Sequence, residues 1–451
     1  MTGTIAAVST GAAVSAIGIV RLSGAEAINA ADRLFVPASG SKMSERPDRS
    51  LVYGKLYRLN GDLLDLCMCT VSRGPNSYTG EDSAEFQCHG SPIVLRTLLE
   101  ELFSLGIRQA KAGEFTKRAF LNGRMELTAA EAVADLIDAE SAEEACNAVG
   151  QISGAISRRT DTIYSALTDI CSHYHAVLDY PDEDIEPFVI EKYRSDLEQS
   201  VSVLESLLKT FSRGKLMKSG VPAVIVGRPN AGKSSLLNAL LGYDRAIVTD
   251  IPGTTRDTIE EKLRLGGVTL RLTDTAGIRD SADAAEKLGV ERSRTAMRDA
   301  DLVIVVIDGS APVTSEDYEI ISAASCAPHA VIAASKCDLG RADLPEFILP
   351  AVEISSVTGE GLDKLEQIVA EMYPLPETPS GEILTNPRQA EAVSSARDYL
   401  KAAISAIDDC ATPDIVLTEA EGAMNAIGEL SGRTVREDVT NRIFERFCVG
   451  K

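Results

Sequence analysis

A run typical of phosphate binding extends from Gly227 to Ser234, where GRPNAGKS follows the apolar run VPAVIV and precedes SLLNALL. The spacing matches G-x-x-x-x-G-K-[ST], in which glycines let backbone N–H groups turn toward phosphates. Lys233 adds a positive charge at the β- and γ-phosphates, and Ser234 offers its hydroxyl to Mg²⁺. A helix that begins here directs its positive end at the anion. The run therefore predicts a strand, a phosphate loop and a helix that bind Mg²⁺ and a nucleoside triphosphate.

Two later motifs indicate guanine as the base. DTAG, Asp274 to Gly277, follows the strand-like run VTLRLT, where the aspartate acts through water on Mg²⁺ and the glycine N–H contacts the γ-phosphate. SKCD follows AVIAA and resembles the guanine-reading N-K-x-D motif, in which Asp338 accepts from guanine N1–H and the 2-amino group. Ser335 replaces the usual Asn, and Val357 in ISSVTGEG stands where a lysine is common. We expect modest nucleotide affinity, with guanine specificity kept by the aspartate.

Hydrolysis needs a water-orienting group and positive charge near the transition state, and neither is in its usual place. Many GTPases carry a Gln after the D-T-A-G glycine, but here the residue is Ile278. TDIPGTTRD, Thr249 to Asp257, is the candidate replacement, because Thr255 is suited to Mg²⁺ and the preceding loop can fold carbonyls around a monovalent cation. Asn230 offers one more neutral oxygen. The alternative is a switch loop that only contacts the γ-phosphate.

Composition bounds the class of protein. The chain has 451 residues, 44% of them hydrophobic and 25% charged, which suggests about three globular domains. No apolar run approaches the ~20 residues of a membrane span, and the N-terminus lacks the basic start of a secretory signal, so we expect a cytoplasmic protein without a membrane contact. The formal charge of −22 argues against a general nucleic-acid scaffold. Nine cysteines include no CxxC pair, which predicts reduced thiols and no zinc site.

The elements that must position these motifs change in type along the chain. Residues 1–118 mix strand-like runs with one helical stretch, SPIVLRTLLEELFSLG, and predict an α+β domain. Residues 119–215 and 378–451 are helical in pattern, and LTAAEA predicts a capping box from Thr128 to Glu131. Residues 216–377 alternate strands and helices, as in a doubly wound α/β domain. We therefore predict a Ras-like P-loop G domain inserted into a helical domain.

Together the motifs identify a family. GRPNAGKSSLLNAL, VTDIPGTTRD, DTAGIR and the terminal FCVGK closely resemble the MnmE (TrmE) family of tRNA modification GTPases. So do GPNSYTGEDSAEFQCHG and GEFTKRAFLNGRMELTAAEAVADLIDA. The similarity covers the whole chain, and its N-terminal and C-terminal motifs are not shared with other GTPases.

The resemblance implies a GTP hydrolase whose G domains meet across their nucleotide faces in a homodimer and are activated by K⁺. It places catalytic roles on Glu286, which helps to orient water, and on Lys233 and Thr255. It places Mg²⁺ on Ser234 and Thr255. The implied K⁺ ligands are Asn230, Thr249, Ile251 and Thr254, the middle two through carbonyls. The implied nucleotide contacts are Asn230, Ala231, Gly232, Lys233, Ser234, Ser235, Thr249, Thr254, Thr255, Asp274, Thr275, Ala276, Gly277, Ser335, Lys336, Asp338, Ser355 and Ser356.

The resemblance also makes the N-terminal domain a folate-binding and dimerisation domain. A tetrahydrofolate derivative, 5-formyl- or 5,10-methylene-tetrahydrofolate, would be the one-carbon donor. Its implied contacts are Arg21, Glu85, Arg124 and Lys451. A carboxylate suits the guanidine-like edge of the pterin, and basic groups suit the glutamate tail. Cys448 in the FCVGK tail would lie near this chemistry, where it either reacts or only packs.

The implied function is modification of the wobble uridine, U34, of tRNA at C5. The products are 5-aminomethyl or carboxymethylaminomethyl types, and the flavoprotein MnmG (GidA) would supply FAD in a heterotetramer-type complex. The sequence leaves open which tRNAs are modified and whether glycine or ammonia is the amine donor. A GTPase switch in ribosome assembly is the alternative, although such proteins usually carry a basic RNA-binding domain. A bare nucleotide-driven regulatory module is the third possibility.

Overall fold

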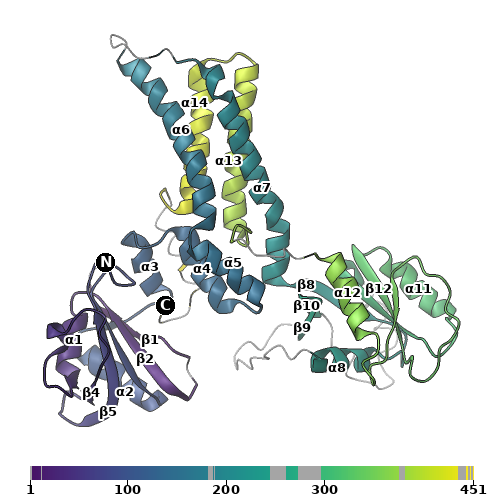
Figure 1. Ribbon diagram of the computed structural model, residues 1–451, viewed down its shortest axis with the longest axis horizontal. Coiled ribbons are helices and arrows are strands. Elements are labelled where there is room, and N and C mark those ends of the chain that lie inside the picture. Colours follow the sequence, from purple (N-terminus) through teal and green to yellow (C-terminus); the bar gives the residue numbers. More distant parts are fainter. Residues whose placement is uncertain are drawn as a thin grey trace.

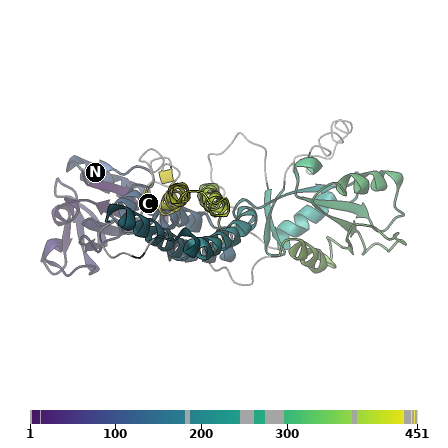
Figure 2. The ribbon, with the colours of Figure 1, turned by 90° about the horizontal axis from the view of Figure 1, so that it is seen from above.

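The computed structural model describes residues 3–11, 13–180, 186, 188–243, 261–272, 296–374, 381–434, 443, 444, 447 and 450. Figure 1 shows an N-terminal sheet domain, a stalk of long helices and a second sheet domain, the G domain, on the other side of the stalk base. Figure 2 shows the three parts in a row, with the stalk in the middle. The predicted multidomain fold class is confirmed.

The N-terminal sheet domain is a mainly antiparallel sheet with α1 and α2 on one face, while Phe115 of α3 packs against Ile5 and Ala7 on the other face. Its sheet order is β3-β4-β5-β6-β2-β1-β7, and only the short β1–β7 pair is parallel. Inward-facing side chains such as Val20, Leu22 and Phe86 alternate with outward-facing ones, as expected for a half-buried sheet. Its elements are β1 (Ile5–Val8), β2 (Ser15–Ser23), α1 (Ala27–Leu34), β3 (Phe35–Pro37), η1 (Met43–Glu45), β4 (Val52–Tyr57), β5 (Leu63–Ser72), β6 (Ser83–Gly90), α2 (Pro92–Ser104), β7 (Arg108–Gln109) and α3 (Glu114–Leu121).

Two local predictions in the first third of the chain were wrong. The predicted single helix is α2, but α1 also forms, and it buries Ala27, Ala30 and Ala31 beside Leu34. Small alanines give a weak apolar signal, although they pack closely. The predicted capping box is absent, because α4 (Leu127–Asp138) begins before Thr128 and has Glu126 as its N-cap.

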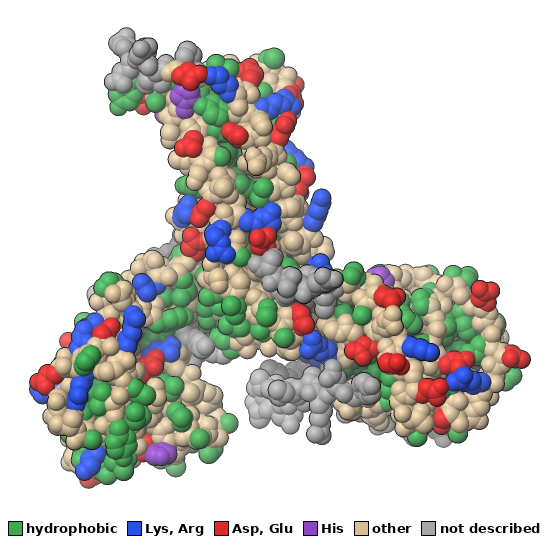
Figure 3. Space-filling model, in the orientation of Figure 1, with side chains coloured by type: hydrophobic (Ala, Val, Ile, Leu, Met, Phe, Trp, Pro, Cys, Tyr) green, Lys and Arg blue, Asp and Glu red, His purple; other side chains and the backbone are tan. Residues whose placement is uncertain are grey.

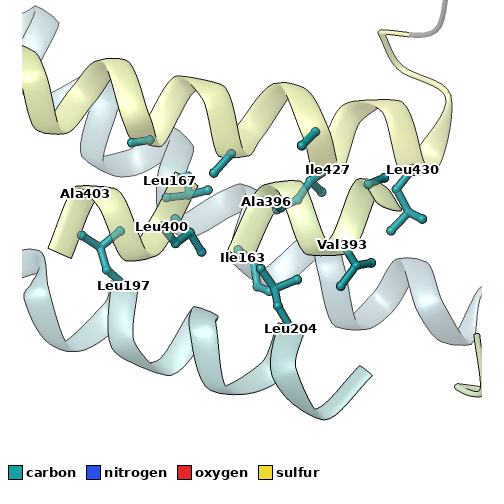
Figure 4. Close-up of a cluster of buried hydrophobic side chains, with 14 of the residues drawn as sticks. Ile163, Leu167, Leu197, Leu204, Val393, Ala396, Leu400, Ala403, Ile427 and Leu430 are labelled. Carbon is teal, nitrogen blue, oxygen red and sulfur yellow. The ribbon is translucent and has the colours of Figure 1, made fainter. Parts of the chain in front are cut away.

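The helical stalk has one continuous apolar core. Figure 4 shows side chains from four long helices meeting between the ribbons, among them Leu167, Leu204, Leu400 and Ile427. Each helix contributes an apolar stripe, so the bundle buries what no single helix could bury alone. The helices after α4 are α5 (Ala142–Ile152), α6 (Ala155–Asp179), η2 (Ile190–Tyr193), α7 (Arg194–Ser219), α13 (Pro387–Asp408) and α14 (Pro413–Ser431).

The G domain interrupts this bundle between α7 and α13. α7 ends at Ser219, and β8 (Val221–Val226) starts after the single residue Gly220. On the return path, the amides of Asn147 and Gln151 both donate to the Ile383 carbonyl, at 3.1 and 2.6 Å. The predicted limits after residues 118 and 215 fall within α3 and α7, so the limits of the domains stay a prediction.

The G domain is a six-stranded sheet of order β13-β12-β11-β8-β10-β9. All neighbours pair in parallel except β9 and β10. β11 and β12 are buried along nearly their whole length, as in sheets covered on both faces. The remaining elements are α8 (Lys233–Tyr243), β9 (Glu261–Leu265), β10 (Val268–Leu272), β11 (Leu302–Asp308), α11 (Ser315–Ala324), β12 (His329–Ser335), β13 (Ala351–Glu353) and α12 (Leu362–Met372).

The end of the chain returns to the N-terminal side of the molecule, where Figure 1 marks both termini. Phe444 and Phe447 pack with Leu127 and Ala130 of α4. Among the described helices, none combines the length and the apolar character that a membrane crossing needs.

Candidate functional site

The phosphate loop leaves the carboxyl end of β8, next to the point where the chain changes sides of the sheet. Strands β10 and β11 flank β8, so the loop lies at a topological switch point, where α/β sheets bind ligands. Asn230 has φ +62° and Gly232 φ +107°. Asn tolerates the first value, whereas a Cβ on Gly232 would lie 2.9 Å from Ser335 Oγ. The loop therefore needs glycine both for its backbone and for space.

Lys233 is held inside the loop. Its Nζ donates to the carbonyls of Gly227 and Arg228, both at 2.8 Å. Burial lowers the pKa of Lys233, with a smaller opposing influence from Glu316. A phosphate placed in the loop would favour the charged form and compensate for this burial. The ammonium is thus held inside the loop, and its contact with the β- and γ-phosphates stays a prediction.

The base of the loop is fixed to a neighbouring helix by a buried ion pair. Arg228 Nε lies 2.6 Å from Asp317 Oδ1. Asp317 is 1% exposed and also forms the capping box of α11 with Thr314. This pair was not predicted, because Arg228 occupies a variable position of the phosphate-binding run and Asp317 is 89 residues away.

Ser335 supports the phosphate loop directly. Its hydroxyl lies within hydrogen-bonding range of the Ala231 carbonyl and 3.1 Å from the Ile307 carbonyl. The side chain is 1% exposed. The short residue that replaces the usual Asn therefore still connects the base-reading motif to the phosphate loop.

The other residues near the predicted guanine-binding position lie at the carboxyl ends of β11, β12 and β13. Lys336 Nζ contacts Asp308 Oδ2 at 2.6 Å, and Ser355 Oγ donates to Asp338 Oδ1 at 2.7 Å. The backbone N–H groups of Val357 and Thr358 in turn donate to Ser355 Oγ. Asp338 is thereby oriented. Asp308 was missed in the sequence, although an Asp that ends a buried strand, as in VVID, is a usable signal.

Ser356 Oγ is buried and has no hydrogen-bond partner among the described residues. It follows Ser355, the residue that contacts Asp338, and its contact with the nucleotide stays a prediction. Ser234 and Ser235 start α8, so the structure brings the predicted residues of the phosphate loop, SKCD and Ser355–Ser356 to one edge of one sheet. The predicted residues Thr249, Ile251, Thr254, Thr255, Asp274, Thr275, Ala276, Gly277 and Glu286 lie outside the described residues.

A second pocket lies on the face of the N-terminal sheet opposite to α1 and α2, beside α3. Arg21 of β2 faces Glu85 of β6 in register, with Nε and Oε1 2.7 Å apart and each side chain about a quarter exposed. Thr70, Ser72 and Tyr78 line the same cavity, which has a volume of about 110 Å³. The Arg21 guanidinium lies 5.6 Å from the ring centre of Tyr78, within cation–π range. The result is a small polar pocket with one acid, one base and an aromatic wall.

Of the other two residues predicted to contact folate, the structure describes only Arg124. Arg124 is exposed, and a Cβ on Gly80 would lie 3.3 Å from Arg124 Cγ, so its stem reaches the loop that lines the pocket. Lys451 and Cys448 lie outside the described residues. Their neighbour Gly450 accepts a hydrogen bond from Ser9 Oγ at 2.9 Å, next to β1. β1 pairs with the Arg21 segment of β2.

A network of charged side chains around the buried Arg118 lies next to this pocket. Arg118 is 1% exposed and contacts Glu81 at 2.6 Å and Glu114 at 3.1 Å, while Arg108 also contacts Glu114. Burial alone would raise the pKa of Glu114, but hydrogen bonds from Arg108 and the Lys111 N–H outweigh it and lower the pKa to about 2. The network fixes α3, whose Thr116 contacts the Tyr78 hydroxyl at 3.0 Å.

The histidines and cysteines behave as structural groups where they are described. His89 Nδ1 contacts Asp65, and His173 Nδ1 contacts the Tyr193 hydroxyl. Burial raises the pKa of Cys69, so that thiol is not poised to react. Among the described residues, no cluster of His, Cys, Asp and Glu is suited to hold a metal ion.

Comparison with known proteins adds to this geometry. Residues 4–124 match the family described as the GTP-binding protein TrmE N-terminus, and residues 127–448 match the MnmE helical domain. The tRNA modification GTPase MnmE of Symbiobacterium thermophilum is 41% identical over 454 residues, which cover 99% of each chain. The protein of the same name from Roseiflexus sp. is 40% identical over 465 residues, again 99% of each chain.

Solved structures include the G domain of the T. maritima FeoB iron transporter, which is 28% identical. It covers 34% of this chain and 98% of that chain, with a TM-score of 0.25. The match of two family regions to most of the chain, together with relatives at about 40% identity over full length, shows that this chain belongs to the MnmE (TrmE) family of tRNA modification GTPases.

Proposed function

We propose that this GTPase acts in modification of the tRNA wobble uridine U34 at C5, with a tetrahydrofolate derivative as the one-carbon donor. The Arg21–Glu85 pocket is the observation that carries the proposal. Glu85 would accept N–H bonds from the pterin edge, Tyr78 would stack against the ring, and Arg21 would hold the carboxylate in place. Arg124 and Lys451 would contact the glutamate tail.

The C-terminal tail would complete this site. Gly450 lies against the β1 segment that pairs with the Arg21 strand, which favours placement of Lys451 and Cys448 near the folate. A flavoprotein partner of the MnmG type would supply FAD and much of the RNA contact, in keeping with the charge of −22 on this chain. The expected product is a 5-aminomethyl or carboxymethylaminomethyl uridine. We place this complex in the cytoplasm.

Binding of 5-formyl-tetrahydrofolate by isothermal titration calorimetry tests the pocket. We expect Glu85→Gln to weaken binding at least about tenfold, because a charge-assisted hydrogen bond contributes roughly 1.5–3 kcal/mol. Arg58→Gln is the matched control, since Arg58 forms an exposed ion pair with Glu101 in the same domain. Equal affinity of Glu85→Gln and wild type would exclude this pocket as the folate site.

GTP hydrolysis would depend on K⁺ and on two G domains that meet in a homodimer. The sheet face opposite to α1 and α2 favours association, because Ile17, Tyr53 and Leu66 are exposed on it, and Figure 3 shows hydrophobic side chains gathered over the N-terminal domain. Thr249, Ile251 and Thr254 would bind K⁺ with Asn230, while Ser234 and Thr255 bind Mg²⁺. Glu286 would orient the attacking water.

GTP turnover in KCl and in NaCl at equal ionic strength tests the cation mechanism. We expect turnover to be at least about tenfold faster in KCl, and Asn230→Ala to remove the difference, since a positive charge at the transition state is worth 10³–10⁵ in related GTPases. Asn238→Ala, on α8 outside the loop, is the control. Equal rates of the wild-type protein in the two salts would overturn the proposal of K⁺ activation.

A further inference from the structure

A cavity of about 350 Å³ lies where the helical stalk meets the G domain, and it belongs to neither site described above. Its walls come from α5, α7, β8, β10, β12 and α12. The residues Val221, Val268 and His329 stand at the amino ends of three strands, whereas the phosphate loop and SKCD leave the carboxyl ends. The cavity therefore opens on the edge of the sheet opposite to the nucleotide. Its volume lies in the usual range for small-molecule sites, about 300–1,000 Å³.

The cavity lies between the two covalent connections of the G domain. Met217 and Val221 flank the α7–β8 joint, and Met372 to Pro374 begin the return path to the stalk. Gly220 at the joint has φ +69°, and a Cβ there would lie 3.0 Å from the Thr269 carbonyl. Two ion pairs, Lys262–Glu140 and Arg264–Glu143, join the same two domains nearby. A rotation of the G domain about this joint must change the shape of the cavity.

The charged groups of the cavity favour an anion. Within the described part of the chain, neither Lys209 nor Arg213 makes an ion pair. Arg213 donates from Nη2 to the Pro374 carbonyl, and its Nη1 has no hydrogen-bond partner among the described residues, whereas Nε is buried away from the cavity. The carboxylates are already engaged, because Glu143 contacts Arg264 at 2.9 Å and Glu144 accepts from the Glu140 N–H and the Ser141 hydroxyl.

The remaining walls favour an apolar, flat body. Leu216, Met217 and Val268 contribute aliphatic surface, and apolar contact supplies most of the binding energy in such pockets. The rings of His329 and Tyr373 meet edge to face, with centroids 4.8 Å apart. The Tyr373 hydroxyl already donates to the Asp301 carbonyl at 3.1 Å, so this ring offers only its apolar surface.

We propose that this interdomain cavity binds a small planar molecule that carries one anionic group, such as an aromatic carboxylate or sulfonate. The anion contacts Arg213, and the ring lies among the aliphatic side chains. Because both domains contact the ligand, its binding fixes the orientation of the G domain on the stalk. The ligand thereby changes the rate at which paired G domains hydrolyse GTP, an effect that rests on the homodimer proposed above.

8-Anilinonaphthalene-1-sulfonate is a suitable probe, because it combines a flat naphthalene ring with one anionic sulfonate and fluoresces in apolar surroundings. The full-length protein is titrated with the dye while saturated with GDP and Mg²⁺. Two variants remove the site in different ways. Ser212→Phe fills the cavity from an exposed position of α7, and Arg213→Gln removes the charge. Ser202→Phe and Lys215→Gln, at exposed positions of the same helix that do not line the cavity, are the matched controls.

We expect the wild type and both controls to show a saturable fluorescence increase that corresponds to one dye per chain. Ser212→Phe and Arg213→Gln should each lower the affinity at least about tenfold, because they remove the space and the counter-charge. Circular dichroism verifies that both variants are folded. Binding that persists equally in both variants, or no saturable binding in the wild type, would overturn the proposal.

GTP turnover with and without saturating dye tests the coupling. We expect a change of about fivefold in the wild type, at the lower end of common coupling factors, and none in Ser212→Phe. Unchanged turnover of a dye-saturated wild type would overturn the coupling while leaving the binding site in place. Loss of folate binding or of K⁺ activation would not affect the dye titration, so failure of the proposed function is distinguishable from failure of this site.

Discussion

The G domain and the N-terminal sheet domain build their sites from different groups. The phosphate loop is a contiguous segment whose ligand position is formed by its own backbone and one lysine, and Ser335 and the Arg228–Asp317 ion pair support it from outside. The N-terminal pocket depends instead on two charged side chains 64 residues apart that meet across a pair of strands. A contiguous loop is fixed by local geometry, whereas the pocket exists only when the whole sheet and α3 are in place. The two sites should therefore fail under different substitutions.

Replacement of Lys233 should produce the largest difference between the activities of the two sites. We expect Lys233→Ala to reduce GTP turnover by about 10³ or more, because it removes the only side-chain charge that the loop itself directs at the phosphates. Folate binding should stay within about twofold of wild type, since the pocket lies in another domain. Turnover by a phosphate-release assay and folate titration on the same preparation measure both. Lys215→Ala is the control. Loss of both activities together would contradict the independence of the two sites.

Neutralising Glu114 should weaken only the N-terminal domain. The pKa of Glu114 in the folded protein is about 2, below the ordinary value of 4.5, so its ionised form stabilises the fold at every pH above about 4.5. That stabilisation, on the order of 3 kcal/mol, disappears as the pH falls from 4.5 toward 2. Glu114→Gln should therefore unfold at a lower temperature than wild type at pH 7, and the difference should shrink by pH 3.

Differential scanning calorimetry at pH 7 and at pH 3 measures this difference. Glu100→Gln is the control, because Glu100 forms an exposed pair with Arg96 on α2 and should change stability by less than about 1 kcal/mol. The GDP affinity of Glu114→Gln should equal that of wild type. An equal destabilisation at both pH values would mean that the charge of Glu114 is not what stabilises the domain.

Removing the Ser335 hydroxyl should affect only the G domain, and by the smallest amount. Ser335→Ala loses the bond to the Ala231 carbonyl, which contributes roughly 1 kcal/mol and corresponds to about a fivefold weaker GDP affinity. Fluorescence titration with a labelled GDP measures the change, and Ser325→Ala, an exposed serine after α11, is the control. An affinity equal to that of wild type would show that the hydroxyl does not support the loop.

What the sequence predicts well follows from short-range rules. The phosphate loop and SKCD each lie within a few residues of the strand that precedes them, and the apolar alternation of β2 and β5 is visible in the chain itself. The helical region split by a G domain is also confirmed. Near residue 221 the sequence changes from apolar residues at a helical spacing of 3.6 to the continuous apolar runs of buried strands.

The missed features depend on contacts between distant residues. The Arg228–Asp317 and Arg118–Glu81 pairs have no local pattern, since their partners meet only in the folded chain. α1 was missed because alanine is only weakly apolar, although it fits the tight space beneath the sheet. The prediction of a capping box was wrong because Thr128 is already inside the helix, where its hydroxyl lies 3.4 Å from Ser157 Oγ.

The interrupted helical stalk also matters while the chain is being synthesised. Roughly 170 residues separate the end of α7 at Ser219 from the start of α13 at Pro387, and at about 5–20 residues per second a ribosome needs on the order of 10–30 seconds to produce them. During that time α6 and α7 have left the ribosome, but the helices that cover Leu197, Leu204 and Leu207 do not yet exist. The G domain completes its own core first. Nascent chains of this protein therefore present a long apolar surface to chaperones until the last helices arrive.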